Sequence, residues 1–129
     1  MLFRGAGLRG DLYRWGYWIF NTYIMKIIRN NIIPFKGFKA INLFGVLFVR
    51  NGATMSDTDL NHEEIHSAQM REMLFIFFYV WYLLEWLFLL LKHKNATEAY
   101  RNISLEREAY ENMYNESYLK NRKPFNWIR

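Results

Sequence analysis

The amino-acid sequence predicts a mainly helical α+β domain that associates with a membrane. Three observations lead to this expectation. The block 73–91 is almost entirely apolar and is long enough to cross a bilayer. A β-prone segment, 40–50, precedes a segment with helix-start signals, and a polar, helix-prone segment, 96–119, follows the apolar block. The length of 129 residues leaves room for a single domain.

The composition indicates a lipid or protein partner. Apolar residues make up 52% of the chain and aromatic residues 19%, which is more than so short a chain can bury. Lipid, or a second copy in a homo-oligomer, would cover the excess. The formal charge of +5 suits an anionic membrane surface or nucleic acid. We favour the membrane and expect no nucleic-acid partner, because many aromatic residues lie in one continuous apolar block instead of alternating with basic residues. The absence of cysteine excludes disulfides and thiolate metal sites.

We interpret the first segment, 1–31, as an amphipathic helix in the membrane interface. It combines Trp and Tyr with Arg and Lys, the side chains that anchor such helices among lipid headgroups. Polar residues interrupt its apolar part and no small-residue cleavage site follows, so a signal peptide fits less well. An ordinary amphipathic core helix is the alternative. Pro34 and Gly37 then mark a break.

The segment 40–50 is expected to form one or two short strands. Gly45 would supply a bend or bulge, and the pair Asn51-Gly52 is a strong turn signal at the end. Helix N-cap candidates follow at 56–59, so a helix is expected over 57–71.

The apolar block 73–91 is expected to form a membrane helix. It carries one charge, Glu85, and ends at a basic cluster typical of a membrane interface. A carboxylate is costly against lipid, so Glu85 should turn toward protein, water or a partner. We interpret it as a protonated or hydrogen-bonded structural carboxyl, and a role in substrate or metal chemistry is the alternative. Whether the helix spans the bilayer, re-enters or lies in the interface stays open at this point. Apolar residues at helical spacing predict a further amphipathic helix over 96–119.

One motif carries chemistry, the H-E-x-x-H signature at 62–66. His62 and His66 are four residues apart on the expected helix, so both imidazoles project from one face and can bind one zinc ion. Glu63 lies at the edge of that face, where it can take a proton from a zinc-bound water. The alternative is a solvated helix face with two incidental histidines.

A catalytic zinc needs a third protein ligand and an open position. His93 lies between two lysines at the end of the apolar block, where a side chain that reaches into the interface is more natural. Glu106 and Glu108 are better candidates. A histidine motif followed by a helix that reads Leu105-Glu-Arg-Glu-Ala-Tyr110 resembles the gluzincin zinc peptidases, among them the membrane-embedded HtpX-like and CAAX-prenyl proteases.

The resemblance implies that Glu106 is the third zinc ligand in a zincin-like domain, with Glu108 in reserve. Tyr110 replaces the aspartate that normally orients a histidine, so Asn61, Gln69 or a backbone carbonyl would have to do this. The resemblance also implies a zinc peptidase of the bacterial inner membrane that cleaves a membrane-proximal peptide. A non-catalytic membrane protein, or a metal-dependent lipid or amide hydrolase, is the alternative. A helix that crossed the bilayer straight over 73–91 would separate His66 from Glu106.

Overall fold

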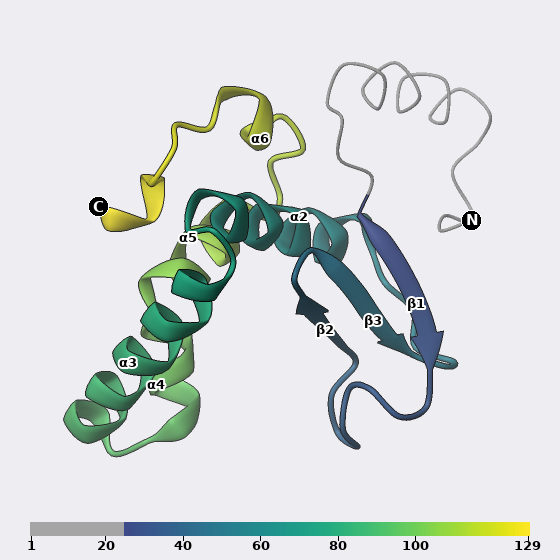
Figure 1. The fold of residues 1–129 in the computed structure, drawn as a ribbon, viewed down its shortest axis with the longest axis horizontal. Coiled ribbons are helices and arrows are strands. Elements are labelled where there is room, and N and C mark those ends of the chain that lie inside the picture. Colours follow the sequence, from purple (N-terminus) through teal and green to yellow (C-terminus); the bar gives the residue numbers. More distant parts are fainter. Residues whose placement is uncertain (1–24) are drawn as a thin grey trace.

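The computed structural model describes residues 25–129 and has a mixed α+β fold (Figure 1). In Figure 1 a small sheet and a pair of helices diverge from a central helix, α2. Most of the helix expected over 1–31 lies outside the described residues. The elements are β1 (Lys26–Asn30), β2 (Ala40–Leu43), β3 (Val46–Arg50), α2 (Asp57–Glu72), α3 (Ile76–His93), α4 (Ala96–Asn102), α5 (Ser104–Asn112), α6 (Tyr118–Asn121) and the 3-10 helix η1 (Asn126–Ile128).

The sheet has the order β1-β3-β2, with β1 parallel and β2 antiparallel to the central strand. Phe44 and Gly45 join β2 to β3, and both have positive φ angles, as tight hairpin turns require. Leu47 and Val49 of β3 are fully buried. The β element expected over 40–50, with a bend at Gly45, is thus confirmed.

The helix expected to run to residue 31 is wrong over Lys26–Asn30, which forms β1. Ile27 pairs with Leu47 and Ile28 with Phe48 in a parallel ladder. β-branched side chains favour an extended chain when a partner strand is present. That partner lies twenty residues further along the chain, so the composition of the segment could not reveal the pairing.

The helix expected over 57–71 is confirmed as α2, and its start is encoded locally. Ser56 accepts a hydrogen bond from the Asp59 amide, and the Asp59 carboxylate accepts one from the Ser56 amide. This reciprocal capping satisfies two amides that the first turn would leave unpaired. Asn42 of β2 ties the sheet to the helix by donating to the Glu63 carbonyl and to Ser67 Oγ.

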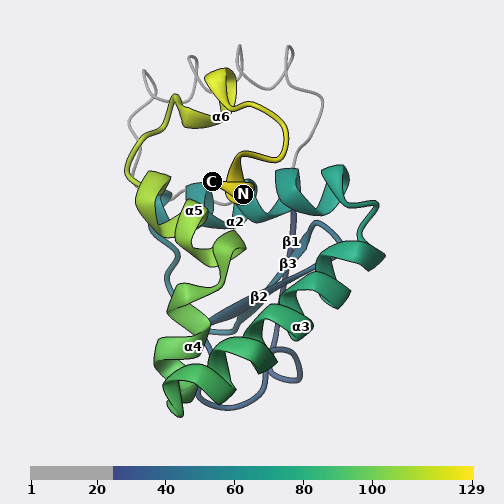
Figure 2. The ribbon, with the colours of Figure 1, turned by 90° about the vertical axis from the view of Figure 1, so that its left-hand side faces the viewer.

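The apolar block forms α3, which begins three residues later than expected, because Leu74 and Phe75 adopt positive φ angles. Lys94 ends α3 in the left-handed conformation, and α4 then packs along it in the reverse direction (Figure 2). The chain therefore returns toward α2 on the side from which it left. This return removes the conflict that a single straight crossing would create between His66 and Glu106.

The single helix expected over 96–119 is wrong, because the chain breaks at Ile103 between α4 and α5. Ile103 is extended, with φ −56° and ψ 131°, and its side chain is fully buried in the core. Glu85 of α3 accepts hydrogen bonds from the amide and the hydroxyl of Ser104, which begins α5. The carboxylate thus caps the new helix, and the expectation that Glu85 faces protein is confirmed.

One face of α3 packs on α4, α5 and η1, and the other face is exposed. Up to Leu91 the exposed face is apolar and includes Ile76, Phe77, Val80, Leu83, Leu84, Leu87, Phe88 and Leu91. By length and composition α3 could cross a membrane. On α4 the side chains of Glu98, Arg101 and Asn102 are exposed, so the polar and apolar surfaces of the helix pair are separated.

Candidate metal centre

The structure brings His62 and His66 of α2 together with Glu106 of α5. All three side chains are buried. The Nε2 atoms of the two histidines are 3.0 Å apart. Glu106 Oε2 lies 3.3 Å from His62 Nε2, and Glu106 Oε1 lies 3.3 Å from His66 Nε2. The i, i+4 spacing on α2 and the break at Ile103, which directs α5 across α2, together produce this arrangement.

The three donors fit a zinc ion in distance and chemistry. A tetrahedral zinc ion with bonds of about 2.0–2.1 Å separates neighbouring donor atoms by roughly 3.3 Å. Glu106 Oε2 is also buried and receives no well-aligned hydrogen bond among residues 25–129, and His62 Nε2 lies 3.3 Å from it. Such a buried carboxylate oxygen is costly unless a cation or a donor meets it. Two imidazoles and one carboxylate are a ligand set typical of catalytic zinc.

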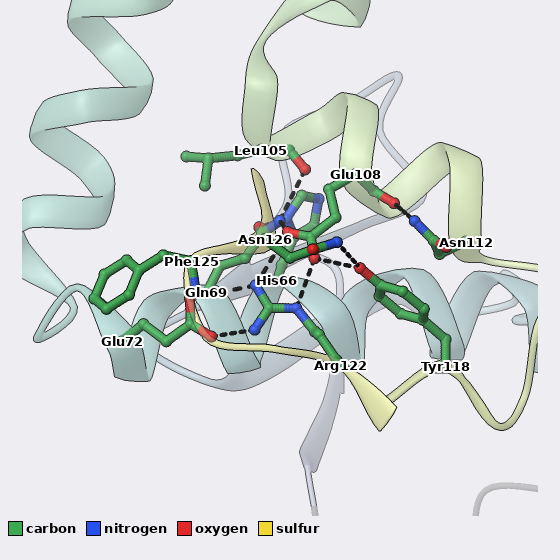
Figure 3. Close-up of polar contacts among 10 residues, drawn as sticks. All are labelled: His66, Gln69, Glu72, Leu105, Glu108, Asn112, Tyr118, Arg122, Phe125 and Asn126. Carbon is green, nitrogen blue, oxygen red and sulfur yellow. Dashed lines mark hydrogen bonds and ion pairs between the residues drawn. The ribbon is translucent and has the colours of Figure 1, made fainter. Parts of the chain in front are cut away.

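Gln69 orients the imidazole of His66. Its side-chain oxygen lies 2.8 Å from His66 Nδ1 and can accept that proton, which leaves Nε2 toward His62 and Glu106 (Figure 3). Gln69 is itself held by two bonds from its amide nitrogen, to Glu108 Oε2 at 2.8 Å and to the Leu105 carbonyl at 3.0 Å. Such a partner behind a histidine fixes its tautomer and direction.

Glu108, the reserve ligand, lies away from the three donors and belongs to an ion network (Figure 3). Arg122, which follows α6, binds Glu108 and also Glu72 near the end of α2. Its side chain is only 4% exposed. Burial raises the pKa of the Glu108 carboxyl, but the bonds from Arg122, Gln69 and Tyr118 outweigh burial and lower it. Glu108 therefore stays charged and anchors Gln69, and the group of possible metal ligands contains Glu106 and not Glu108.

Two tyrosines contact the candidate metal ligands. Tyr82 of α3 donates to Glu106 Oε1 at 2.7 Å and leaves Oε2 for another partner. Tyr110 packs its ring edge against His62 at 4.6 Å between centroids. The Nδ1 atom of His62 is buried with no hydrogen-bond partner among the described residues. On the Nδ1 side the ring is therefore held by packing against Tyr110, while its Nε2 faces Glu106 Oε2 at 3.3 Å.

The other candidates named from the sequence lie elsewhere. Asn61 donates to three carbonyls that follow or end α5, at Asn112, Met113 and Asn115, so it positions α5 and not a histidine ring. His93 lies at the far end of α3 and pairs with Glu98, 3.8 Å away.

The electrostatics of the group depend on its burial. Burial alone would lower the pKa of His66, but the charge of Glu106 and its hydrogen bond outweigh burial and raise the pKa to about 9. Burial raises the pKa of Glu106, yet the His66 charge and hydrogen bonds from both histidines and Tyr82 hold it well below the usual range. Without metal, then, His66 and Glu106 form a buried ion pair at neutral pH. A metal ion must displace the proton on His66 Nε2.

Burial raises the pKa of Glu63, although the nearby histidines and Asn42 oppose the shift. A carboxyl with a raised pKa is a better proton acceptor than an ordinary glutamate. Asn42, Tyr82 and Arg122 also hold residues of the site in place, and these roles were not predicted from the sequence. Asn42 and Arg122 lack any local signal, because their partners are far away in the sequence.

Comparisons of the chain with protein-family models, curated proteins and solved structures give no match. The resemblance to gluzincins therefore stays a prediction from two short motifs.

Proposed function

We propose that the protein is a zinc-dependent hydrolase that cleaves peptides close to a membrane. The observation that carries the proposal is the buried group His62, His66 and Glu106, which offers one ligand atom from each residue within 4.8 Å of the others. Glu106 Oε2 also receives no well-aligned hydrogen bond among residues 25–129. His62 and His66 would each provide Nε2, and Glu106 would provide Oε2. When bound, zinc would supply Lewis acidity and lower the pKa of a water molecule.

Glu63 would act as the general base. It follows His62 on α2, and burial raises its pKa toward the range in which a carboxylate both accepts and returns a proton. Glu63 would take a proton from the attacking water and then deliver it to the leaving amine nitrogen. Asn42 donates a hydrogen bond to the backbone carbonyl of Glu63. This bond would fix the part of α2 that carries the carboxylate.

A peptide substrate is supported by the sheet. Among residues 25–129 the strand β2 pairs with β3 on one side only, and Asn42 brings it against α2 beside Glu63. An extended peptide could add to this edge through main-chain hydrogen bonds and present a carbonyl to the metal. The apolar exposed face of α3 supports a location at a membrane.

The proposal is tested with full-length protein and three variants. Glu63→Gln should keep one zinc per chain but lose peptide hydrolysis, and His66→Ala should lose the zinc. Glu64→Gln, the adjacent glutamate outside the ligand group, is the matched control and should keep both. Hydrolysis is followed by mass spectrometry with a lipid-tethered peptide library, and a phospholipid and a simple amide serve as rival substrates. Peptide cleavage by Glu63→Gln at the wild-type rate would refute the mechanism, and turnover of the rivals alone would refute the substrate class.

A further inference from the structure

The loop 31–39, between β1 and β2, exposes large apolar side chains. The exposed fractions are 80% for Ile32, 82% for Phe35 and 65% for Phe38. The loop nevertheless has a defined shape. Asn30 Oδ1 accepts hydrogen bonds from the amides of Ile32 and Ile33, at 2.8 and 2.7 Å. Its apolar side chains are therefore presented outward by an ordered turn, and water alone is a poor environment for them.

The surface around this loop is basic. The sequence has no acidic residue between Asp11 and Asp57, and the part of this stretch that the structure describes carries Lys26, Arg29, Lys36, Lys39 and Arg50. Lys39 is paired with Asp59 across a 2.6 Å contact. No carboxylate within residues 25–129 pairs with the other four. The Arg50 guanidinium donates to the Pro34 carbonyl, which joins the basic rim directly to the loop.

The loop and the far end of the α3–α4 pair lie at the same end of the molecule. Figures 1 and 2 both show them below α2, while α6 lies above it. The exposed face of α3 is apolar as well. Loop 31–39 and α3 could therefore contact the same flat surface at this end of the molecule. A flat apolar layer with negative charge at its edge is the surface of a bilayer that contains anionic lipids.

We propose that loop 31–39 is a membrane-docking loop, which inserts Ile32, Phe35 and Phe38 among lipid chains while the exposed side chains of Lys26, Arg29 and Lys36 contact anionic headgroups. The loop thus forms a second contact with the bilayer beside α3. Together the two contacts orient the molecule, with the segment between α5 and α6 directed away from lipid. This inference does not depend on the metal centre.

The absence of cysteine allows a site-specific test. An environment-sensitive fluorophore is attached to Phe35→Cys, or to Tyr114→Cys as the matched control. Tyr114 is also an exposed aromatic residue, at 80%, but it lies between α5 and α6. Each full-length protein is mixed with, or reconstituted into, vesicles of phosphatidylcholine with phosphatidylglycerol that carry a quencher on their acyl chains.

We expect lipid quenching at position 35 and little at position 114. Lys36→Gln should weaken binding to the anionic vesicles about fivefold, as loss of one basic contact predicts, while the exposed control Lys123→Gln should not. Equal quenching at both positions, or none at position 35 while the protein is bound to vesicles, would overturn the proposal. It would also be overturned if the label at position 35 responded only to rising protein concentration, which would indicate a second copy, or only to added nucleic acid.

Discussion

Replacing Gln69 by leucine should weaken zinc binding without touching a ligand. Gln69 is fully buried and lies one helical turn from His66, whose Nδ1 it meets at 2.8 Å. Leucine fills a similar volume but accepts no hydrogen bond. Because the His66 side chain is only 7% exposed, water cannot readily take the place of the lost oxygen. The imidazole is then free to rotate, and its Nδ1 proton is left without a partner.

The size of the effect follows from the bonds that are lost. A buried group left without its partner costs about 1–3 kcal/mol. For His66 this corresponds to a loss of roughly 10–100-fold in zinc affinity, the range usual for the partner behind a metal-bound histidine. Glu108 and the Leu105 carbonyl each lose a donor as well, although Glu108 keeps Arg122. We therefore expect the metal-free protein to lose about 2–4 kcal/mol in its free energy of unfolding.

The assay is a competition titration against a chromogenic zinc chelator, with denaturant unfolding measured in parallel. Ser67→Ala is the control, because Ser67 is buried on the same helix and donates to the Glu63 carbonyl but does not contact the ligands. It should lower stability by about 1 kcal/mol and leave zinc affinity unchanged. If Gln69→Leu bound zinc as tightly as the wild type, Gln69 would not set the orientation of His66.

Three further predictions concern the ion network, the helix break and pH. Arg122→Met should lower the free energy of unfolding by about 3–5 kcal/mol, measured by denaturant titration, because it leaves two buried carboxylates without their shared cation. Arg122→Lys should recover only part of the lost free energy of unfolding, since one ammonium cannot bridge both Glu72 and Glu108. Full recovery would count against the role of the guanidinium as a bridge between the two carboxylates. Glu85→Leu should lower the free energy of unfolding by about 2–3 kcal/mol and weaken zinc binding, because Ser104 at the start of α5 loses its cap. An unchanged zinc affinity would show that α5 is held in other ways. The pKa of His66 is raised to about 9 in the metal-free site, so its contribution to stability is full below about pH 6.5 and is lost as pH rises to about 9. Thermal unfolding of metal-free protein should show this fall, while zinc affinity should rise over the same range; a metal-free stability that rose with pH would refute the buried ion pair.

The sequence predicted those parts of the fold that are encoded within a few residues. The capping pair Ser56 and Asp59 and the spacing of His62 and His66 both act within one or two helical turns, so α2 and the shared face of the histidines could be deduced. The Phe44-Gly45 turn within 40–50 is also local. Glu106 was named as a ligand candidate because its motif resembles that of the gluzincins, and in the structure it lies beside both histidines.

The errors occurred where a distant residue decides the local conformation. β1 exists because β3 is available for parallel pairing, and the break at Ile103 is stabilised by Glu85 from another helix. Gln69 was named among several possible partners, but its own anchor, the Glu108 and Arg122 pair, connects segments that only the folded chain brings together. A local pattern cannot contain such information, since pairing over a long loop depends on the whole fold.

The most direct test of the account is the coordination of zinc by the full-length protein. X-ray absorption at the zinc edge, together with elemental analysis, should show one zinc per chain with two imidazole nitrogens and carboxylate oxygen from Glu106. His62→Ala, His66→Ala and Glu106→Ala should each weaken binding by orders of magnitude, and the exposed Glu111→Ala should have no effect. Failure of the wild type to bind zinc stoichiometrically, or retention of the same spectrum in Glu106→Ala, would contradict the proposed metal centre.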